Sequence, residues 1–93
     1  MKKYLKIVIT GQGKEHAFYE LIQKYAHSSL IEGALLNEND GNIVIHACGT
    51  TEKLDAFIDK LYQGAPTYKV TDLIAEPLNT QKDYRNAFRI IEN

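Results

Sequence analysis

The sequence lacks the features that mark several large classes of protein. It has one cysteine, Cys48, which excludes an internal disulfide and is compatible with a reducing compartment. No apolar run approaches the roughly 20 residues that a membrane-spanning helix needs. The formal net charge of -1 gives no general attraction to nucleic acid or to anionic lipid. We therefore expect a soluble cytoplasmic protein that binds neither nucleic acid nor membrane.

The chain also lacks internal repeats, linkers and low-complexity tracts. Its 93 residues, of which 44% are hydrophobic, suffice for one modest core. The basic start, "MKKYLKIVIT", is too short in its apolar part for a signal peptide and is interrupted by Lys6. We predict a single domain over residues 1–93.

Apolar and polar residues alternate at the start of the chain. Leu5, Ile7 and Ile9 fall on one face of residues 4–10, which predicts a strand with one buried face. Two further apolar runs, 30–37 and 43–49, flank Asp40-Gly41 and indicate a β-hairpin. Strands are also predicted at two later segments rich in β-branched and aromatic residues, which a polar loop separates. They are 67–77 and 87–91, and the loop is 78–86.

Two segments have apolar residues at three- and four-residue spacing, the period of an amphipathic helix. They are residues 16–27 and 51–63. Thr50 or Thr51 can cap the start of the second helix, while Gly64 and Pro66 are typical of its end.

The resulting order is β-α-β-β-α-β with one additional short C-terminal strand. This order is typical of the ferredoxin-like α/β sandwich, an α+β fold with two helices on one face of a mainly antiparallel sheet. Right-handed crossovers place the first and third strands side by side at the centre of such a sheet.

Motifs at fixed spacing narrow the family. Gly11 follows the first strand and Phe18 comes seven residues later. "GALLNENDG" supplies Gly33, Asn37 and Asp40-Gly41, "LYQGAP" ends the second helix, and "FRI" stands in the final strand. Over essentially its whole length the chain resembles the acylphosphatase family, whose members hydrolyse the carboxyl-phosphate bond of acyl phosphates.

The resemblance implies a site with three parts. Backbone N–H groups of the loop before the first helix surround the phosphate, an arginine just after the phenylalanine clamps it, and an asparagine on the second strand orients the attacking water. The water-orienting position falls on Asn37. The anion-binding loop falls on Gln12, Gly13, Lys14, Glu15, His16, Ala17 and Phe18. N–H dipoles, a guanidinium fork and one positioned water suit phosphoryl transfer. No metal or other cofactor is expected, and the spacing of the three histidines suggests no metal site.

The sequence departs from the family at the arginine position, which is occupied by Tyr19. Glu15 replaces a central glycine of the loop, and Gly13 replaces an apolar residue. A carboxylate repels a phosphate, and a residue other than glycine restricts the backbone. Lys14 or His16 could restore some positive charge, but neither stands at the arginine position, and a lysine does not reproduce a bidentate fork.

Two functional classes follow. The chain is either an acylphosphatase-like hydrolase that is weak or inactive without its arginine, or a small-anion or protein-binding regulatory module on the same fold. RNA binding is disfavoured because the third strand, "IVIHACG", has no aromatic residue on which a base could stack. Tyr19 either fills the space of the missing arginine or is exposed, and Cys48 is expected to be a buried, inert thiol. A monomer whose ligand is phosphate or an acyl phosphate is expected.

Overall fold

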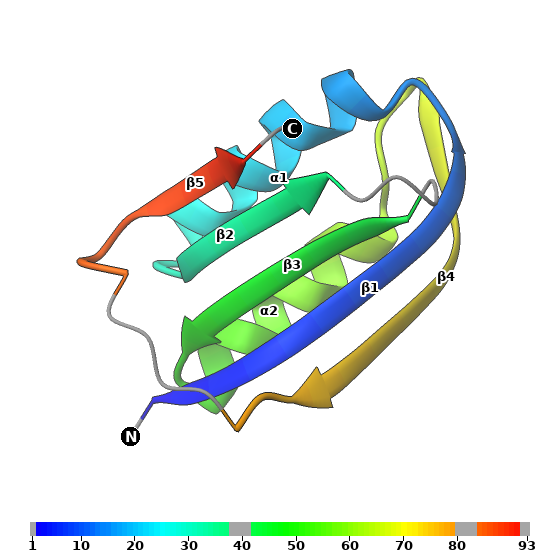
Figure 1. Cartoon of the computed structure of the whole chain (residues 1–93). Helices are drawn as coiled ribbons and strands as arrows, with labels where there is room; N and C mark the ends of the chain where they lie inside the picture. The colour runs from blue at the N-terminus through cyan, green and yellow to red at the C-terminus, as the bar shows by residue number, and fades with distance from the viewer. Residues whose placement is uncertain (1, 38–41, 80–83, 92–93) are drawn as a thin grey trace.

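A computed structural model describes residues 2–37, 42–79 and 84–91 (Figure 1). Along the described chain the elements are β1 (Lys3–Gly13), α1 (Glu15–Ser28), β2 (Glu32–Asn37), β3 (Ile43–Gly49), α2 (Thr51–Tyr62), β4 (Tyr68–Pro77) and β5 (Phe88–Ile91). This order confirms the predicted β-α-β-β-α-β arrangement with a short last strand. Both helices begin and end within one residue of the predicted bounds.

The five strands form one sheet in the order β4-β1-β3-β2-β5. β1 and β3 lie side by side at the centre, as the crossover rule predicts, and β1 pairs antiparallel with both β3 and β4. β2 and β3 pair antiparallel as in a hairpin, whereas Asp40 and Gly41, the predicted turn, lie outside the described residues. β5 is the only parallel partner among these strands, because it runs beside β2 in the same direction. The sheet is therefore mixed, and the ferredoxin-like fold is confirmed.

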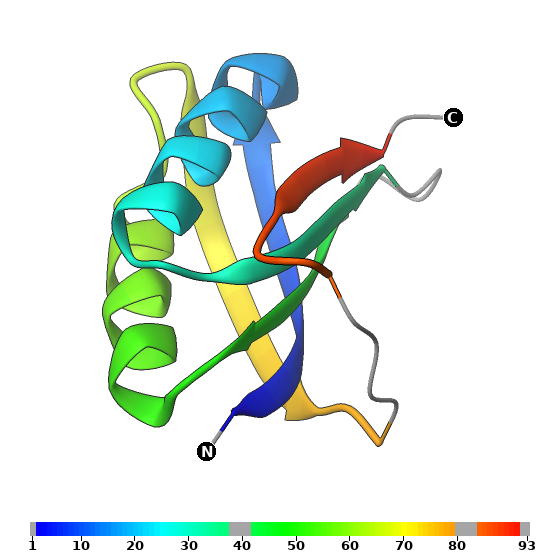
Figure 2. The same cartoon turned by 90° about the vertical axis from the view of Figure 1, so that its left-hand side faces the viewer.

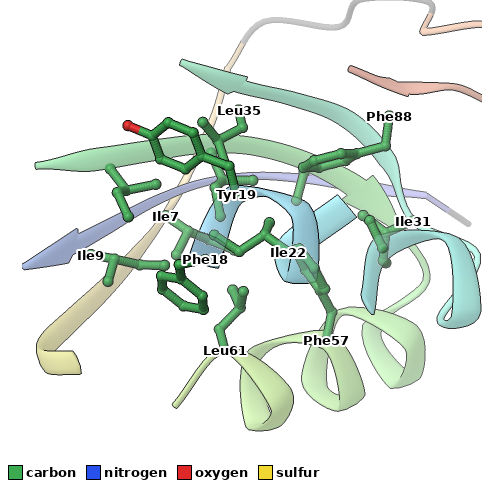
Figure 3. Close-up of a cluster of buried hydrophobic side chains, with 14 of the residues drawn as sticks. Ile7, Ile9, Phe18, Tyr19, Ile22, Ile31, Leu35, Phe57, Leu61 and Phe88 are labelled. Carbon is green, nitrogen blue, oxygen red and sulfur yellow. The ribbon is translucent and has the colours of Figure 1, made fainter. Parts of the chain in front are cut away.

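Both helices pack on the same face of the sheet, and Figure 2 shows the helix layer beside the sheet. The core lies between the layers (Figure 3). Its largest fully buried side chains are Phe18, Phe57, Ile7, Ile9, Ile22, Leu35, Ile43, Ile45, Leu54 and Leu61. The spacing of Ile7 and Ile9 in β1 is therefore explained by burial of one strand face. No helix within the described residues has the length and apolar character to cross a membrane.

The ends of α2 follow its predicted signals. The Thr50 hydroxyl accepts a hydrogen bond from the Lys53 backbone N–H at 3.3 Å, so Thr50 is the N-cap. Gly64 has a φ of +64°, the left-handed conformation that commonly ends a helix. α1 ends differently, since the non-glycine residue Leu30 takes the left-handed conformation with a φ of +57°.

Candidate phosphate site at the start of α1

The predicted anion-binding loop is divided between a strand and a helix. Gln12 and Gly13 continue β1 and pair with Lys69 and Tyr68 of β4. Lys14 is the N-cap position of α1, and its backbone N–H donates to the Thr67 carbonyl at 2.7 Å. The first part of the loop is therefore held in the sheet, and the Lys14 N–H already has an acceptor.

Gly13 makes this arrangement possible. Its φ is +132°, a conformation that L-residues rarely adopt. A Cβ atom built at Gly13 would lie 1.9 Å from the carbonyl oxygen of Thr67. Only glycine allows the β1–α1 junction to lie this close to the segment before β4.

The remaining loop residues, Glu15 to Phe18, form the first turn of α1. No side chain at Lys14 caps the helix, so this turn lacks the capping bond that Thr50 supplies in α2. Backbone N–H groups in a first helical turn point outward along the axis and favour a negative charge. In this chain the negative charge nearest to that turn in sequence is the carboxylate of Glu15 itself.

Tyr19 fills the interior below this turn. Only 2% of its surface is exposed, and Figure 3 shows the ring within the core cluster with its hydroxyl pointing out of it. The hydroxyl donates to the Glu15 carboxylate at 3.1 Å, and the ring meets the His16 ring edge-on at 5.3 Å. Tyr19 is therefore a buried residue and not an exposed helix residue.

Tyr68 is a second buried tyrosine at this junction, and no sequence pattern predicts a role for it beyond its strand. Its ring stacks on Phe18 at 4.9 Å and lies against Gly11, where a Cβ atom would approach the ring to 2.6 Å. The Tyr68 hydroxyl is buried and has no hydrogen-bond partner in the described structure. Burial, together with the negative charge of Glu15, raises the pKa of Tyr68. The sequence signal for this contact is Gly11, whose missing side chain leaves space for the Tyr68 ring.

Asn37, the predicted water-orienting residue, is the last residue of β2 and pairs with Ile43 of β3. Its side chain lies outside the described part of the structure. The end of β2 and the start of α1 lie at the same end of the molecule in Figures 1 and 2. The backbone thus brings Asn37 to the same end of the fold as the first turn of α1.

The chain has two arginines, Arg85 and Arg89. They line a hollow of about 300 Å³ beside Ala34 and Ile91. Arg89 is the strand neighbour of the core residue Phe88, so its side chain projects from the sheet face opposite the helices. Arg89 therefore lies on the other side of the sheet from α1, and the exposed Lys14 is the cation nearest in sequence to the first turn of α1.

Cys48 lies at the other end of β3 from the hairpin. It is 1% exposed, which confirms that Cys48 is buried, and burial raises the pKa of its thiol. It forms part of the lining of a cavity of about 470 Å³ between the end of α1 and the start of α2. Within the described ranges no three acidic, histidine or cysteine side chains are grouped as a metal ion would require.

Comparison with known proteins agrees with the fold and motifs. The acylphosphatase family model matches residues 5–90. An acylphosphatase from Bacillus licheniformis is 31% identical over 71 residues, which cover 76% of this chain and 79% of that protein. One from Thermotoga petrophila is 31% identical over 74 residues, covering 80% of this chain and 82% of the relative.

Solved structures give the same result. The crystal structure of acylphosphatase from Bacillus subtilis superposes with a TM-score of 0.87 at 25% identity, covering 98% of this chain and 99% of that one. The acylphosphatase from Coxiella burnetii superposes with a TM-score of 0.86 at 22% identity, covering 97% of this chain and 93% of that one, and supports the fold. The architecture is that of an acylphosphatase-like ferredoxin fold. The chain belongs to the acylphosphatase family.

Proposed function

We propose that this chain is an acylphosphatase-like protein that hydrolyses acyl phosphates weakly or not at all. The observation that supports the proposal is the burial of Tyr19 in the core, because the resemblance places this residue at the family's arginine position. A phenol supplies one hydrogen bond and no charge, whereas a guanidinium supplies a charged, bidentate fork. Loss of an arginine clamp in phosphoryl transfer costs on the order of 10³–10⁵ in rate.

Glu15 supports the same proposal through charge. Its carboxylate accepts the Tyr19 hydroxyl in the first turn of α1, where the family's phosphate would bind. A second anion at that turn would be repelled, and Glu15 already interacts favourably with the helix dipole. The chain has thus replaced a ligand's negative charge with one of its own.

A missing backbone donor adds to this effect. The Lys14 N–H is committed to the Thr67 carbonyl at 2.7 Å and is not available to a phosphate oxygen. Removal of one preorganised donor from an oxyanion site costs roughly 10²–10³ in rate. Weak turnover is therefore the expected result even where a phosphate can still approach.

Binding of a small anion without turnover is the second candidate function. It is favoured by the absence of a side-chain cap on α1 and by the exposed ammonium group of Lys14 beside the first turn. Phosphate and acyl phosphates are the anions of the right charge and size for such a turn.

Hydrolysis of benzoyl phosphate by the purified protein tests the first candidate. We expect turnover about 10³-fold or more below that of an arginine-bearing acylphosphatase measured in parallel. Tyr19→Arg should raise it, and Tyr19→Lys, which restores charge without the fork, should raise it less. Turnover by the unaltered protein in the range of the arginine-bearing enzyme would contradict the proposal.

Phosphate titration, followed by NMR, separates the two candidates. The double variant Glu15→Gly, Tyr19→Arg removes the repulsive carboxylate and supplies the fork, so it should bind phosphate more tightly than the unaltered protein. Each charge-assisted hydrogen bond regained contributes about 1.5–3 kcal/mol. Thermal unfolding of each variant checks that the fold persists, since Tyr19 is a core residue. A folded double variant that binds no phosphate would show that this turn has lost the anion site and serves another purpose.

A further inference from the structure

The sheet face opposite the helices carries one apolar side chain from each strand, in a continuous row. The register places Ile74 beside Val8, Val8 beside Val44, Val44 beside Leu36, and Leu36 beside Ile91. These residues alternate with core residues, so they project from the face that is turned toward the viewer in Figure 1. The two ends of the row, Ile74 and Ile91, are 51% and 46% exposed.

A second row lies next to the apolar row and carries charges of opposite sign at its two ends. In sheet order it consists of Glu76, Lys6, His46, Ala34 and Arg89. Glu76 on β4 and Arg89 on β5 are exposed, and in the described part of the chain neither makes a hydrogen bond or an ion pair. Lys6 is the cross-strand neighbour of Glu76, whereas the neighbour of Arg89 is the uncharged Ala34.

The two edges of the sheet also differ in shape. At the β5 edge, Arg89, Ile91, Ala34 and Arg85 line the hollow of about 300 Å³. At the β4 edge, Ile74 stands half exposed on the outermost strand. One edge of this face is therefore concave and basic, and the other presents an exposed isoleucine next to a carboxylate.

We propose that this face binds a second copy of the chain in a symmetric dimer, with the two-fold axis running along β3. This rotation places β4 of each copy over β5 of the other, because β3 is the central strand of the five. Ile74 then lies over the hollow of the second copy, and Glu76 faces its Arg89. Sheets stack in this way about 10 Å apart, within about 30° of alignment, and the side chains of glutamate and arginine are long enough to meet across that space.

Charge selects this axis over the other face-to-face arrangement. A two-fold axis running along the apolar row, across the strands, would place Glu76 opposite Asp72 of the second copy, because these residues lie two positions on either side of Ile74. Both are exposed acidic residues on the same face of β4. Like charges in such positions repel, whereas the axis along β3 pairs Glu76 with a guanidinium twice in each dimer.

The exposed apolar surface is small, because Val44 in the centre of the row is only 6% exposed. We expect a weak dimer with a dissociation constant on the order of 100 μM, so that dilute protein is the monomer expected from the sequence. α1 and Tyr19 are on the opposite face of the sheet, so the interface leaves the candidate phosphate site uncovered. The dimer therefore stands or falls independently of the hydrolase proposal.

Sedimentation equilibrium from 10 μM to 1 mM protein at low salt tests the dimer. The average mass should rise from 10.6 kDa toward twice that value with concentration. Ile74→Lys places a cation against two arginines and should abolish the rise. Tyr62→Lys removes a similarly exposed apolar side chain from α2, outside this face, and should leave the rise unchanged. The proposal would be overturned if the unaltered protein stayed monomeric at 1 mM, or if Ile74→Lys and Tyr62→Lys reduced the rise in average mass equally.

Charge reversal tests the orientation. Glu76→Arg and Arg89→Glu should each weaken dimerisation about tenfold, since each turns two attractive contacts into repulsive ones. The combination of both reversals should restore the affinity to within about threefold of the unaltered protein. Failure of the combined variant to recover would overturn this arrangement. Saturable binding of inorganic phosphate at Arg85 and Arg89 without any dimer would also overturn it and would assign the hollow to a free anion.

Discussion

The two helices of this protein begin in different ways, although both start after a strand of the same sheet. Thr50 caps α2 through its hydroxyl, and the glutamate that follows at position 52 stands in the first turn. α1 begins after Lys14, which offers no capping oxygen, and its first turn is braced by the Tyr19 hydroxyl on Glu15. The start of α2 is satisfied by local capping, whereas the start of α1 depends on contacts with β4 and the core.

This difference bears on the proposal that the start of α1 has lost the function of a phosphate site. A phosphate loop requires donors that stay unpaired until the ligand arrives. Around the start of α1, the Lys14 N–H donates to the Thr67 carbonyl, and the Glu15 carboxylate accepts the hydroxyl of Tyr19, the residue that the resemblance places at the arginine position. Changes at the two helix starts should therefore have effects of different size and kind.

Gly13→Ala should have the largest effect on stability. The added methyl group would meet the Thr67 oxygen at 1.9 Å, and the φ of +132° is strained for alanine. Strain of this kind costs about 1–3 kcal/mol, and displacement of Thr67 would also break its bond to Lys14. We expect a loss of at least about 3 kcal/mol in the free energy of unfolding, measured by urea denaturation.

Gly49→Ala is the matched control at the start of α2. Its added Cβ would meet only the flexible end of the Ile31 side chain at 2.8 Å, and no left-handed φ is involved. A smaller loss than that of Gly13→Ala is expected. Equal losses would show that the β1–α1 junction is no more constrained than the β3–α2 junction.

Thr50→Ala should have the next largest effect. It removes the hydroxyl that accepts from the Lys53 N–H, and loss of an N-cap costs about 1 kcal/mol. Thr50→Ser keeps the hydroxyl and should recover most of the stability in the same denaturation experiment. If the serine variant were as unstable as the alanine variant, the methyl group of Thr50 and not its cap would be the cause.

The sequence predicts α2 well and α1 only in part, for a physical reason. The signals of α2 are local: a capping threonine, an apolar stripe and a terminal glycine. The pairing of Gly13 with Tyr68 joins positions 55 residues apart, and no spacing rule reveals it. The burial of Tyr19 is not predictable from the sequence either, because it depends on how α1 packs against the sheet.

The two buried tyrosines at the start of α1 offer a further test. The Tyr19 hydroxyl has a partner in Glu15, whereas the buried Tyr68 hydroxyl has none in the described structure. Tyr19→Phe should therefore lower the free energy of unfolding by about 1 kcal/mol, and Tyr68→Phe should raise it by a similar amount. Destabilisation in both variants would indicate that Tyr68 has a hydrogen-bond partner in solution.

Alkaline pH should distinguish the Tyr68 variant further. Burial raises the pKa of Tyr68 above its usual value of 10.0, so the folded state favours the neutral phenol. The corresponding stability is present below about pH 10 and is lost as the pH rises through the folded-state pKa. Between pH 7 and pH 10.5, the free energy of unfolding should fall less for Tyr68→Phe than for the unaltered protein, as measured by unfolding curves at both pH values. Some loss should remain, because burial raises the pKa of Tyr84 and of Cys48 as well.

The smallest effect is expected when α1 is given the cap that α2 already has. In Lys14→Ser the hydroxyl can accept from a backbone N–H in the first turn, since Lys14 has the extended backbone of an N-cap, with φ -87° and ψ 104°. The ψ of 104° at Lys14 differs from the 160° of the capping residue Thr50, so the new cap should be weaker than that of α2. The expected gain is about 0.5 kcal/mol in the free energy of unfolding. The Lys14 backbone bond to Thr67 is retained.

The same substitution should also weaken phosphate binding in the double variant Glu15→Gly, Tyr19→Arg, because the serine hydroxyl would use a donor that the anion needs. Lys14→Ala is the control, since it removes the ammonium group without adding a hydroxyl. A larger loss of phosphate binding with serine than with alanine would show that the backbone donors of the turn hold the anion. Equal losses would assign the binding to the charge of Lys14, and the start of α1 would then differ from that of α2 in stability alone.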